Sequence, residues 1–316
     1  MKQLPFLVML AALLVAPFVV YPLFLANALC LALFACAFNL LAGYSGLLSF
    51  GHAAFLGTAG YITAYTTKSW GYSPELGILA GVAASTLLGA FFGFLAIRRQ
   101  GLYFAMVTLA LAQMVYFVCL QAPFTGGENG IQPVPRGRLF GLIDLSPNLT
   151  MYYFALAIFL IGYGIIYRTI HSPYGRVLKA ISENEPRALS LGYRVDQYKL
   201  LAFTLSAALS GLAGSTKVLV YQLASLADVS FGTSGEVLLM VLIGGLGTVI
   251  GPVIGAFIVA TMVNYLAQYG SWVTVIQGVI FVVCVLIFRR GVAGEAAALL
   301  RRWQARGAVA KPAPGE

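Results

Sequence analysis

The chain has 316 residues, of which 60% are hydrophobic and only 9% are charged. A soluble domain carries charge on about 25% of its residues, so this composition excludes an ordinary soluble protein and indicates an all-α, polytopic integral membrane protein. The formal net charge is +9. Most basic residues stand beside apolar segments, where the positive-inside rule places them, and this argues against nucleic acid as a partner.

Ten apolar segments follow one another, and several are shorter than the roughly 20 residues that a full membrane span needs. We therefore expect eight to ten transmembrane helices, some of them short or broken. The segments cover residues 5–21, 23–42, 49–66, 76–97, 101–121, 151–167, 200–222, 232–248, 253–268 and 272–288. The first one resembles a secretory signal peptide, but no small-residue cleavage site follows it, and we expect it to be retained as a span.

Basic residues predict the topology of the chain. Ten crossings place Lys2, the pair Arg98-Arg99, the charged block 168–199 and the basic C-terminal residues on the cytoplasmic side. Both termini are then cytoplasmic, and an even number of spans is favoured. The predicted organisation is a transmembrane domain (1–290) with an external loop (122–150) and a cytoplasmic loop (171–198). The tail 291–316 is rich in Ala, Gly and Pro after Arg306 and is expected to be partly disordered.

The cytoplasmic loop interrupts the apolar pattern. It and its flanks carry nine charges, namely Arg168, Arg176, Lys179, Glu183, Glu185, Arg187, Arg194, Asp196 and Lys199. At roughly 2.5–3.5 kcal/mol each, placing them at a bilayer centre would cost on the order of 25 kcal/mol, so this loop lies in water.

Two short helices are predicted in this loop. Pro173 is suited to the first position of one helix and Pro186 to the first position of another, and Gly192 is suited to end the second. Their apolar residues are Val177, Leu178 and Ile181 in the first and Ala188, Leu189 and Leu191 in the second. A basic amphipathic loop of this kind either lies on anionic lipid headgroups or docks on a partner protein.

Glycines recur four residues apart inside the spans, which lets neighbouring helices approach closely. Examples are Gly77 and Gly81, Gly89 and Gly93, and Gly247, Gly251 and Gly255. Ser49-Phe50-Gly51 opens one span from the inside, and Ser230-Phe231-Gly232 opens another from the outside. An inverted repeat of two five-helix halves would give this pattern.

The sequence lacks the common motifs of nucleotide-binding sites, hydrolases and metal sites. No lysine stands between Gly and Ser or Thr as in a phosphate-binding loop, and no GxSxG or HExxH motif occurs. The glycines at 245, 247 and 251 loosely resemble a dinucleotide fingerprint, but no strand precedes them and no acidic residue follows at the required distance. Cys30, Cys36, Cys119 and Cys284 fall in apolar stretches without metal-ligand spacing. We expect no catalytic residue, no metal site and no cofactor.

Few ionisable residues lie in the spans, which argues against a carrier coupled to protons or sodium. His52 has two interpretations: packing at a helix interface, or lining a polar path. Glu236 is the single carboxylate that we place inside an apolar segment, near its outer end. A permease driven by a separate motor protein fits this pattern better than a stand-alone carrier or channel, or an enzyme with a membrane-embedded site.

Several motifs together resemble the permeases of ABC importers for branched-chain amino acids, and in particular the second of the two permease subunits of such systems. The resemblance covers roughly residues 25–290, with the motifs in the order of the family. They are Gly43-Tyr-Ser-Gly46-Leu-Leu-Ser-Phe-Gly-His52, Gly101-Leu-Tyr-Phe-Ala-Met-Val-Thr-Leu-Ala110, Thr125-Gly-Gly-Glu-Asn-Gly-Ile131, Glu183-x-Glu185-x-x-Ala188-x-x-x-Gly192, Gly211-Leu-Ala-Gly214, Gly244-Gly-Leu-Gly-Thr248 and Gly251-Pro-Val-Ile-Gly-Ala256.

The resemblance implies an importer in the inner membrane, with membrane lipid around it. Its partners would be a second, homologous permease, two ATP-binding cassette subunits and a periplasmic solute-binding protein. Urea and short-amide permeases share most of these motifs and remain the alternative for the substrate. Pro186 departs from the pattern of the family and is expected to shift the start of its helix.

The coupling positions follow from the same resemblance, whereas the resemblance says little about the residues that contact the substrate. The positions expected to couple to the ATPase are Glu183, Glu185, Arg187, Ala188, Leu191 and Gly192. The candidate translocation path consists of Gly43, Ser45, Gly46, Ser49, His52, Thr108, Glu236, Gly245 and Gly247.

Overall fold

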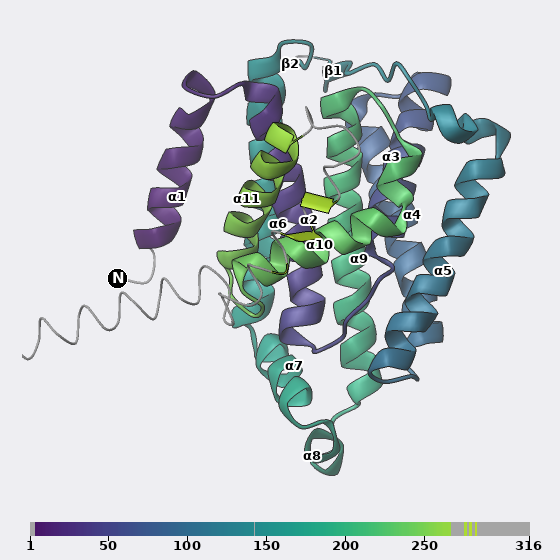
Figure 1. Cartoon of the computed structure of the whole chain (residues 1–316), viewed down its shortest axis with the longest axis vertical. Helices are drawn as coiled ribbons and strands as arrows, with labels where there is room; N and C mark the ends of the chain where they lie inside the picture. Colours follow the sequence, from purple (N-terminus) through teal and green to yellow (C-terminus); the bar gives the residue numbers. More distant parts are fainter. Residues whose placement is uncertain (1–3, 142, 267–274, 277, 280–281, 283–316) are drawn as a thin grey trace, which may run out of the picture.

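The computed structural model describes residues 4–266 except 142, together with 275–276, 278–279 and 282. This part of the chain is a bundle of helices (Figure 1). One end carries the short hairpin of β1 (Arg138–Leu139) and β2 (Ile143–Asp144), in which Arg138 pairs with Asp144. The other end carries α8 (Glu185–Ser190). We call these the hairpin end and the α8 end.

Five helices of the described chain are long and apolar enough to cross a membrane. They are α2 (Pro22–Tyr44), α4 (Pro74–Ala96), α5 (Leu102–Gln121), α6 (Asn148–His171) and α9 (Val195–Tyr221). The remaining elements are α1 (Leu4–Val15), α3 (His52–Ser69), α7 (Pro173–Glu183), α10 (Phe231–Gly244) and α11 (Gly251–Leu266), with single 3-10 turns η1 (Ala16–Phe18), η2 (Pro123–Thr125), η3 (Gly127–Asn129) and η4 (Leu226–Val229).

Each apolar segment predicted before residue 270 coincides with a helix. The structure shortens the segment 232–248, because Gly245 takes a φ of +108° and ends α10 at Gly244. It also ends α1 at Val15, within the segment 5–21. The segment 272–288 falls almost wholly outside the described residues, and the tail 291–316 does so entirely. The total number of spans therefore stays a prediction.

Helices α2 and α9 form the centre of the bundle. The apolar window of α2 is 78% buried and that of α9 is 72% buried, against 33% for α4 and 28% for α5. Cys30 and Cys36 on α2 are buried free thiols, as predicted, and so is Cys119 on α5; Cys284 lies outside the described residues. The two central helices run in opposite directions, since α2 ends at the α8 end and α9 begins there (Figure 1).

Each central helix is followed by a stretch without α-helix and then by a helix that starts inside the bundle. Residues 46–51 follow α2 and lead into α3, and residues 222–230 follow α9 and lead into α10. The two Ser-Phe-Gly motifs stand at these starts and meet: the ring centroids of Phe50 and Phe231 are 5.7 Å apart. The amide of Ala53 also donates to Ser234 Oγ at 3.1 Å. An inverted repeat of two halves would give this arrangement, and the repeat stays a prediction.

Candidate functional site

The predicted loop helices exist as α7 and α8. Ser172 caps α7, with its hydroxyl accepting a hydrogen bond from the amide of Gly175 at 3.3 Å. Asn184 separates the two helices and caps α8, with its side-chain oxygen accepting from the amide of Arg187 at 3.0 Å. Because Asn184 takes the cap, α8 begins one residue earlier than predicted, and Pro186 occupies its second position. Gly192, with φ +87°, follows the end of α8 as predicted.

One face of α8 is fixed to the bundle. The carboxylate of Glu185 forms an ion pair with the ammonium of Lys199 on α9 at 2.7 Å, and Lys199 is 3% exposed. Ala188 is buried in a small cluster with Ile181 of α7 and Val195 of α9. Glu185 and Ala188, both predicted to contact the ATPase, therefore face α9.

Tyrosine contacts add a second attachment of this loop to α9. The Tyr174 hydroxyl donates to the backbone carbonyl of Tyr198 at 2.8 Å, and the two rings stack with centroids 5.5 Å apart. Burial raises the pKa of Tyr174, so this hydroxyl remains a donor at any physiological pH. The two loop helices are thus joined rigidly to the start of α9.

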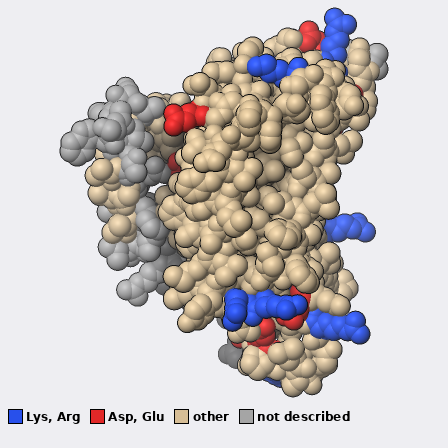
Figure 2. Space-filling model, turned by 90° about the vertical axis from the view of Figure 1, so that its right-hand side faces the viewer, with Lys and Arg blue, Asp and Glu red and all other residues tan. Residues whose placement is uncertain are grey.

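The side of α8 that faces away from α9 is exposed. Leu189 is 56% exposed and Leu191 is 69% exposed. The other predicted coupling residues, Glu183, Arg187 and Gly192, are exposed as well. Charged side chains gather at the two ends of the molecule, and the broad face between them is largely free of charge (Figure 2). We call Arg187 and Leu189 of α8, together with Leu191 at its C-terminal cap and Glu183 at the end of α7, the outer face of α8. Leu189 was not among the predicted site residues, although it is apolar.

The segment after α2 connects α7 with the interior of the bundle. Gly46 has φ +71°, and a side chain there would press on Ser182 of α7 at 3.0 Å. Ser45 closes α2 by donating to the carbonyl of Leu41 at 2.6 Å. Farther along, the amide of Phe50 donates to the Thr108 hydroxyl of α5 at 3.2 Å, and Ser49 accepts from the amide of Gly51 at 3.1 Å.

His52 is fully buried where α2, α3 and α9 meet. Its Nε2 lies 2.9 Å from the Ser206 hydroxyl, which itself donates to the carbonyl of Ala37 at 2.6 Å. Because the single hydroxyl proton of Ser206 is used in that bond, Nε2 of His52 is the donor to Ser206. Of the two interpretations of His52, this geometry matches the helix interface.

The break between α10 and α11 is held against α2. The side chain of Asn39 donates to the carbonyl of Thr248 at 2.8 Å and accepts from the amide of Gly247 at 2.9 Å. Gly43 allows this contact, because a Cβ there would lie 2.6 Å from the nitrogen of Gly247. Three predicted path residues, Gly43, Gly245 and Gly247, are thus brought to one place. Asn39, which the sequence analysis missed, holds them.

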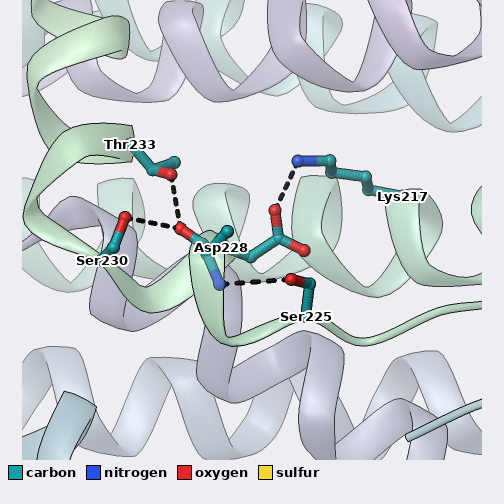
Figure 3. A network of polar contacts seen from close by, with 6 residues as sticks. Lys217, Ser225, Asp228, Ser230 and Thr233 are labelled. Carbon is teal, nitrogen blue, oxygen red and sulfur yellow. Dashed lines mark hydrogen bonds and ion pairs between the residues drawn. The ribbon is translucent and has the colours of Figure 1, made fainter. Parts of the chain in front are cut away.

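A charged cluster lies near the hairpin end of α9. The ammonium of Lys217 and the carboxylate of Asp228 in η4 form an ion pair at 2.6 Å (Figure 3). Glu236 on α10 is half-buried and close enough to interact electrostatically with Lys217. Glu236 was predicted as a site residue and its two neighbours were not, although a lysine inside the apolar segment 200–222 is visible in the sequence.

Comparison with known proteins places these elements in a family. The model of the branched-chain amino acid transport system permease component matches residues 21–287. The high-affinity branched-chain amino acid transport system permease protein LivM of Escherichia coli (strain K12) is 28% identical over 276 residues, which cover 78% of this chain and 64% of LivM. LivM of Salmonella typhimurium has the same identity and coverage.

A more distant relative is the ribose import permease protein RbsC of Bacillus subtilis, 30% identical over 184 residues that cover 53% of this chain and 52% of RbsC. No solved structure matches the chain. The match with the family model includes the central helices, the helices that start inside the bundle and the loop helices α7 and α8. The chain is a multi-pass membrane protein that belongs to the family of permease components of branched-chain amino acid transport systems.

Proposed function

We propose that this chain is one of two different permease subunits of a binding-protein-dependent ABC importer for leucine, isoleucine and valine in the inner membrane. Two separate ATPase subunits drive transport, and a periplasmic binding protein delivers the substrate. The observation that carries the proposal is the family match over residues 21–287, because it spans both the membrane helices and the loop helices. The substrate class rests on the likeness to LivM, of which the chain spans 64% of the length.

The outer face of α8 is the proposed contact with an ATPase subunit. Its two leucines expose apolar surface at an end of the molecule rich in charge, and apolar side chains at such a place are typical of a protein contact. In this proposal Glu185 and Ala188 do not enter the ATPase. They hold α8 on α9 through the ion pair with Lys199 and the small apolar cluster, so that the contact acts on a rigid unit.

Two routes lead from this contact to the interior. One route is α9 itself, which Lys199 and Val195 join to α8 and which reaches the hairpin end. The other is the segment 46–51, which rests on Ser182 of α7 and leads to the start of α3. A change of the ATPase dimer on nucleotide binding displaces α7 and α8, and both routes carry the displacement to the helix starts inside the bundle.

Substitutions on the outer face of α8 test this function in the complete importer. We expect Leu191→Asp to lower ATP-dependent leucine uptake at least tenfold and to weaken co-purification of the ATPase, because a carboxylate replaces a desolvated apolar contact. The permease itself should insert and fold normally, since Leu191 is exposed. Gln100→Asp in the α4–α5 loop adds the same charge at the same end and should leave uptake unchanged. Wild-type uptake by Leu191→Asp would contradict the contact.

The same preparation tests the substrate and the energy source. We expect the wild-type complex to import leucine with its binding protein and ATP, and to import neither urea nor ribose. Uptake of urea or ribose in place of leucine would assign another substrate. Robust leucine flux through the permease alone, without ATP, would favour a stand-alone carrier.

A further inference from the structure

Three ionisable side chains meet near the hairpin end, within or beside membrane helices, and the ATPase contact uses none of them. Lys217 is on the last full turn of α9, Asp228 is in η4 and Glu236 is on the second turn of α10. We call these three residues the Lys217 site. Charges at such positions are costly unless they pair with each other or line a path, so they mark a functional site unless a structural role explains them.

The turn that carries Asp228 has supports other than the ion pair. The turn that presents Asp228 is fixed by hydroxyl groups: Ser225 Oγ accepts from the amide of Ala227 at 3.2 Å. Ser230 Oγ and Thr233 Oγ1 both donate to the carbonyl of the same residue, at 2.7 and 2.8 Å (Figure 3). The turn is also anchored by apolar burial of its first and last residues. It therefore does not need Lys217 to hold its shape.

The charges of the Lys217 site do not balance. Two carboxylates surround one ammonium, and among the described residues Glu236 forms neither an ion pair nor a hydrogen bond, although Lys217 attracts it. A half-buried carboxylate in this position lacks a cation of its own. An additional ammonium group would supply it.

The site lies between the hairpin end and the start of α10. The side chains of Lys217 and Asp228 are mostly buried, with 17% and 15% of their surface exposed. Toward the hairpin end, the chain before η4 pairs with the loop after α5, as Ala224 and Ile131 exchange two backbone hydrogen bonds of 3.1 Å. Toward the interior, η4 leads directly into α10, whose first residue, Phe231, touches Phe50.

We propose that the Lys217 site binds the charged groups of a free amino acid on its way through the permease. The α-carboxylate pairs with Lys217, and the α-ammonium pairs with Asp228 and Glu236. The zwitterion adds one charge of each sign, so the net charge of the site is unchanged, but both carboxylates of the site then contact an ammonium group while Lys217 keeps a carboxylate partner. The side chain of the amino acid remains outside these contacts. A neutral solute such as a sugar or urea cannot make them. The inference rests on the proposed function and names the residues that contact the substrate.

Replacing both members of the ion pair separates this proposal from a structural pair. Exchanging a buried ion pair for neutral side chains of similar volume is often neutral for stability, whereas removing one member leaves an unpaired charge. If the pair is structural, Lys217→Met with Asp228→Asn leaves leucine uptake near the wild-type rate. If it binds the substrate, uptake by the double variant falls at least tenfold, while ATP hydrolysis stimulated by the binding protein stays within about threefold of wild type.

Glu236 gives a second, independent test in the same complete importer with radiolabelled leucine. We expect Glu236→Gln to lower uptake at least tenfold and Glu128→Gln in the exposed loop after α5 to leave uptake unchanged. Uptake near the wild-type rate in either Glu236→Gln or the double variant overturns the site alone. A wild-type importer that takes up no amino acid overturns the proposed function as well.

Discussion

Arg136 lies in the loop between α5 and α6 and is 8% exposed. Its guanidinium donates to the carbonyls of Leu219 and Val220 at 3.2 and 2.8 Å, and to Ser146 and Asn148 at 3.0 Å. The first two carbonyls belong to the last turn of α9, where no helical amide is left to satisfy them. Burial lowers the pKa of Arg136 from its ordinary value of 12.5, but the guanidinium remains charged in proteins. One cation thus joins the loop to the end of a central helix.

We expect Arg136→Met to destabilise the protein by about 2–4 kcal/mol, because several buried acceptors lose a charged donor at once. The measurement is thermal unfolding of the purified protein in detergent. Arg138→Met is the matched control, since Arg138 is exposed on the hairpin two residues away, and its effect should stay within about 0.5 kcal/mol. Equal melting temperatures for the two variants would show that Arg136 does not anchor the loop.

Single side chains were the least predictable part of the candidate site. The sequence shows that the loop 171–198 is charged and amphipathic, and it predicts two short helices, each with a proline near its start, and the stop at Gly192. It does not show that Glu185 turns inward, because its partner Lys199 belongs to the next helix and the pairing depends on how α8 folds back onto α9. Asn39 was missed for the same reason. The carbonyl that accepts from its side chain and the amide that donates to it belong to residues more than 200 positions later in the sequence.

At the scale of helices, small residues decide how closely α3, α4 and α9 pack. A side chain at Gly214 of α9 would collide with the backbone of Leu56 on α3, and one at Gly89 of α4 with Ala207 of α9. The predicted packing role of Gly81, Gly89 and Gly93 is confirmed, as all three face side chains of neighbouring helices. Because backbone cannot move aside as a flexible side chain can, the contact at Gly214 is the least tolerant.

Gly214→Ala should therefore lower the melting temperature and the yield of folded protein, with a cost of about 1–3 kcal/mol from overpacking. Gly164→Ala on α6 is the control, because Gly164 is also helical and has no atom within 4 Å of the position of a new Cβ. There the same substitution should be neutral or stabilising by up to about 1 kcal/mol. A Gly214→Ala protein as stable as Gly164→Ala would refute the close contact.

The helices themselves were largely predictable, because apolar composition and Pro or Gly at the boundaries are local properties. Pro22, Pro74 and Pro173 each stand at the first position of a helix. The hairpin of β1 and β2 was not predicted, since its strands have two residues each and no alternating apolar pattern. The apolar run continues to residue 248, but α10 ends early at the positive φ of Gly245, where the sequence Gly244-Gly245-x-Gly247 favours a break of the backbone.

At the scale of the whole molecule, the two routes from the loop helices converge on one contact. The segment 46–51 lies near Ser182 of α7 at Gly46 and contains Phe50. Helix α9 is joined to Glu185 by the ion pair of Lys199, and the chain after α9 leads through η4 to Phe231. The two routes are attached to different points of the loop. We therefore expect a tilt of α7 and α8 to change the position of Phe50 relative to Phe231.

Cross-linking tests that relative movement. Phe50→Cys and Phe231→Cys, combined with Cys284→Ser, place two thiols at a contact whose ring centroids are 5.7 Å apart, while the three remaining native thiols are buried and unreactive. We expect a short bis-methanethiosulfonate reagent to lower leucine uptake at least tenfold and dithiothreitol to restore it. The reagent should leave each single-cysteine variant active, because a single attached thiol does not join the segments. Full uptake by the cross-linked double variant would mean that the two segments stay together throughout the transport cycle, and the displacement of α7 and α8 would then have to reach the path as a rigid movement of the whole bundle.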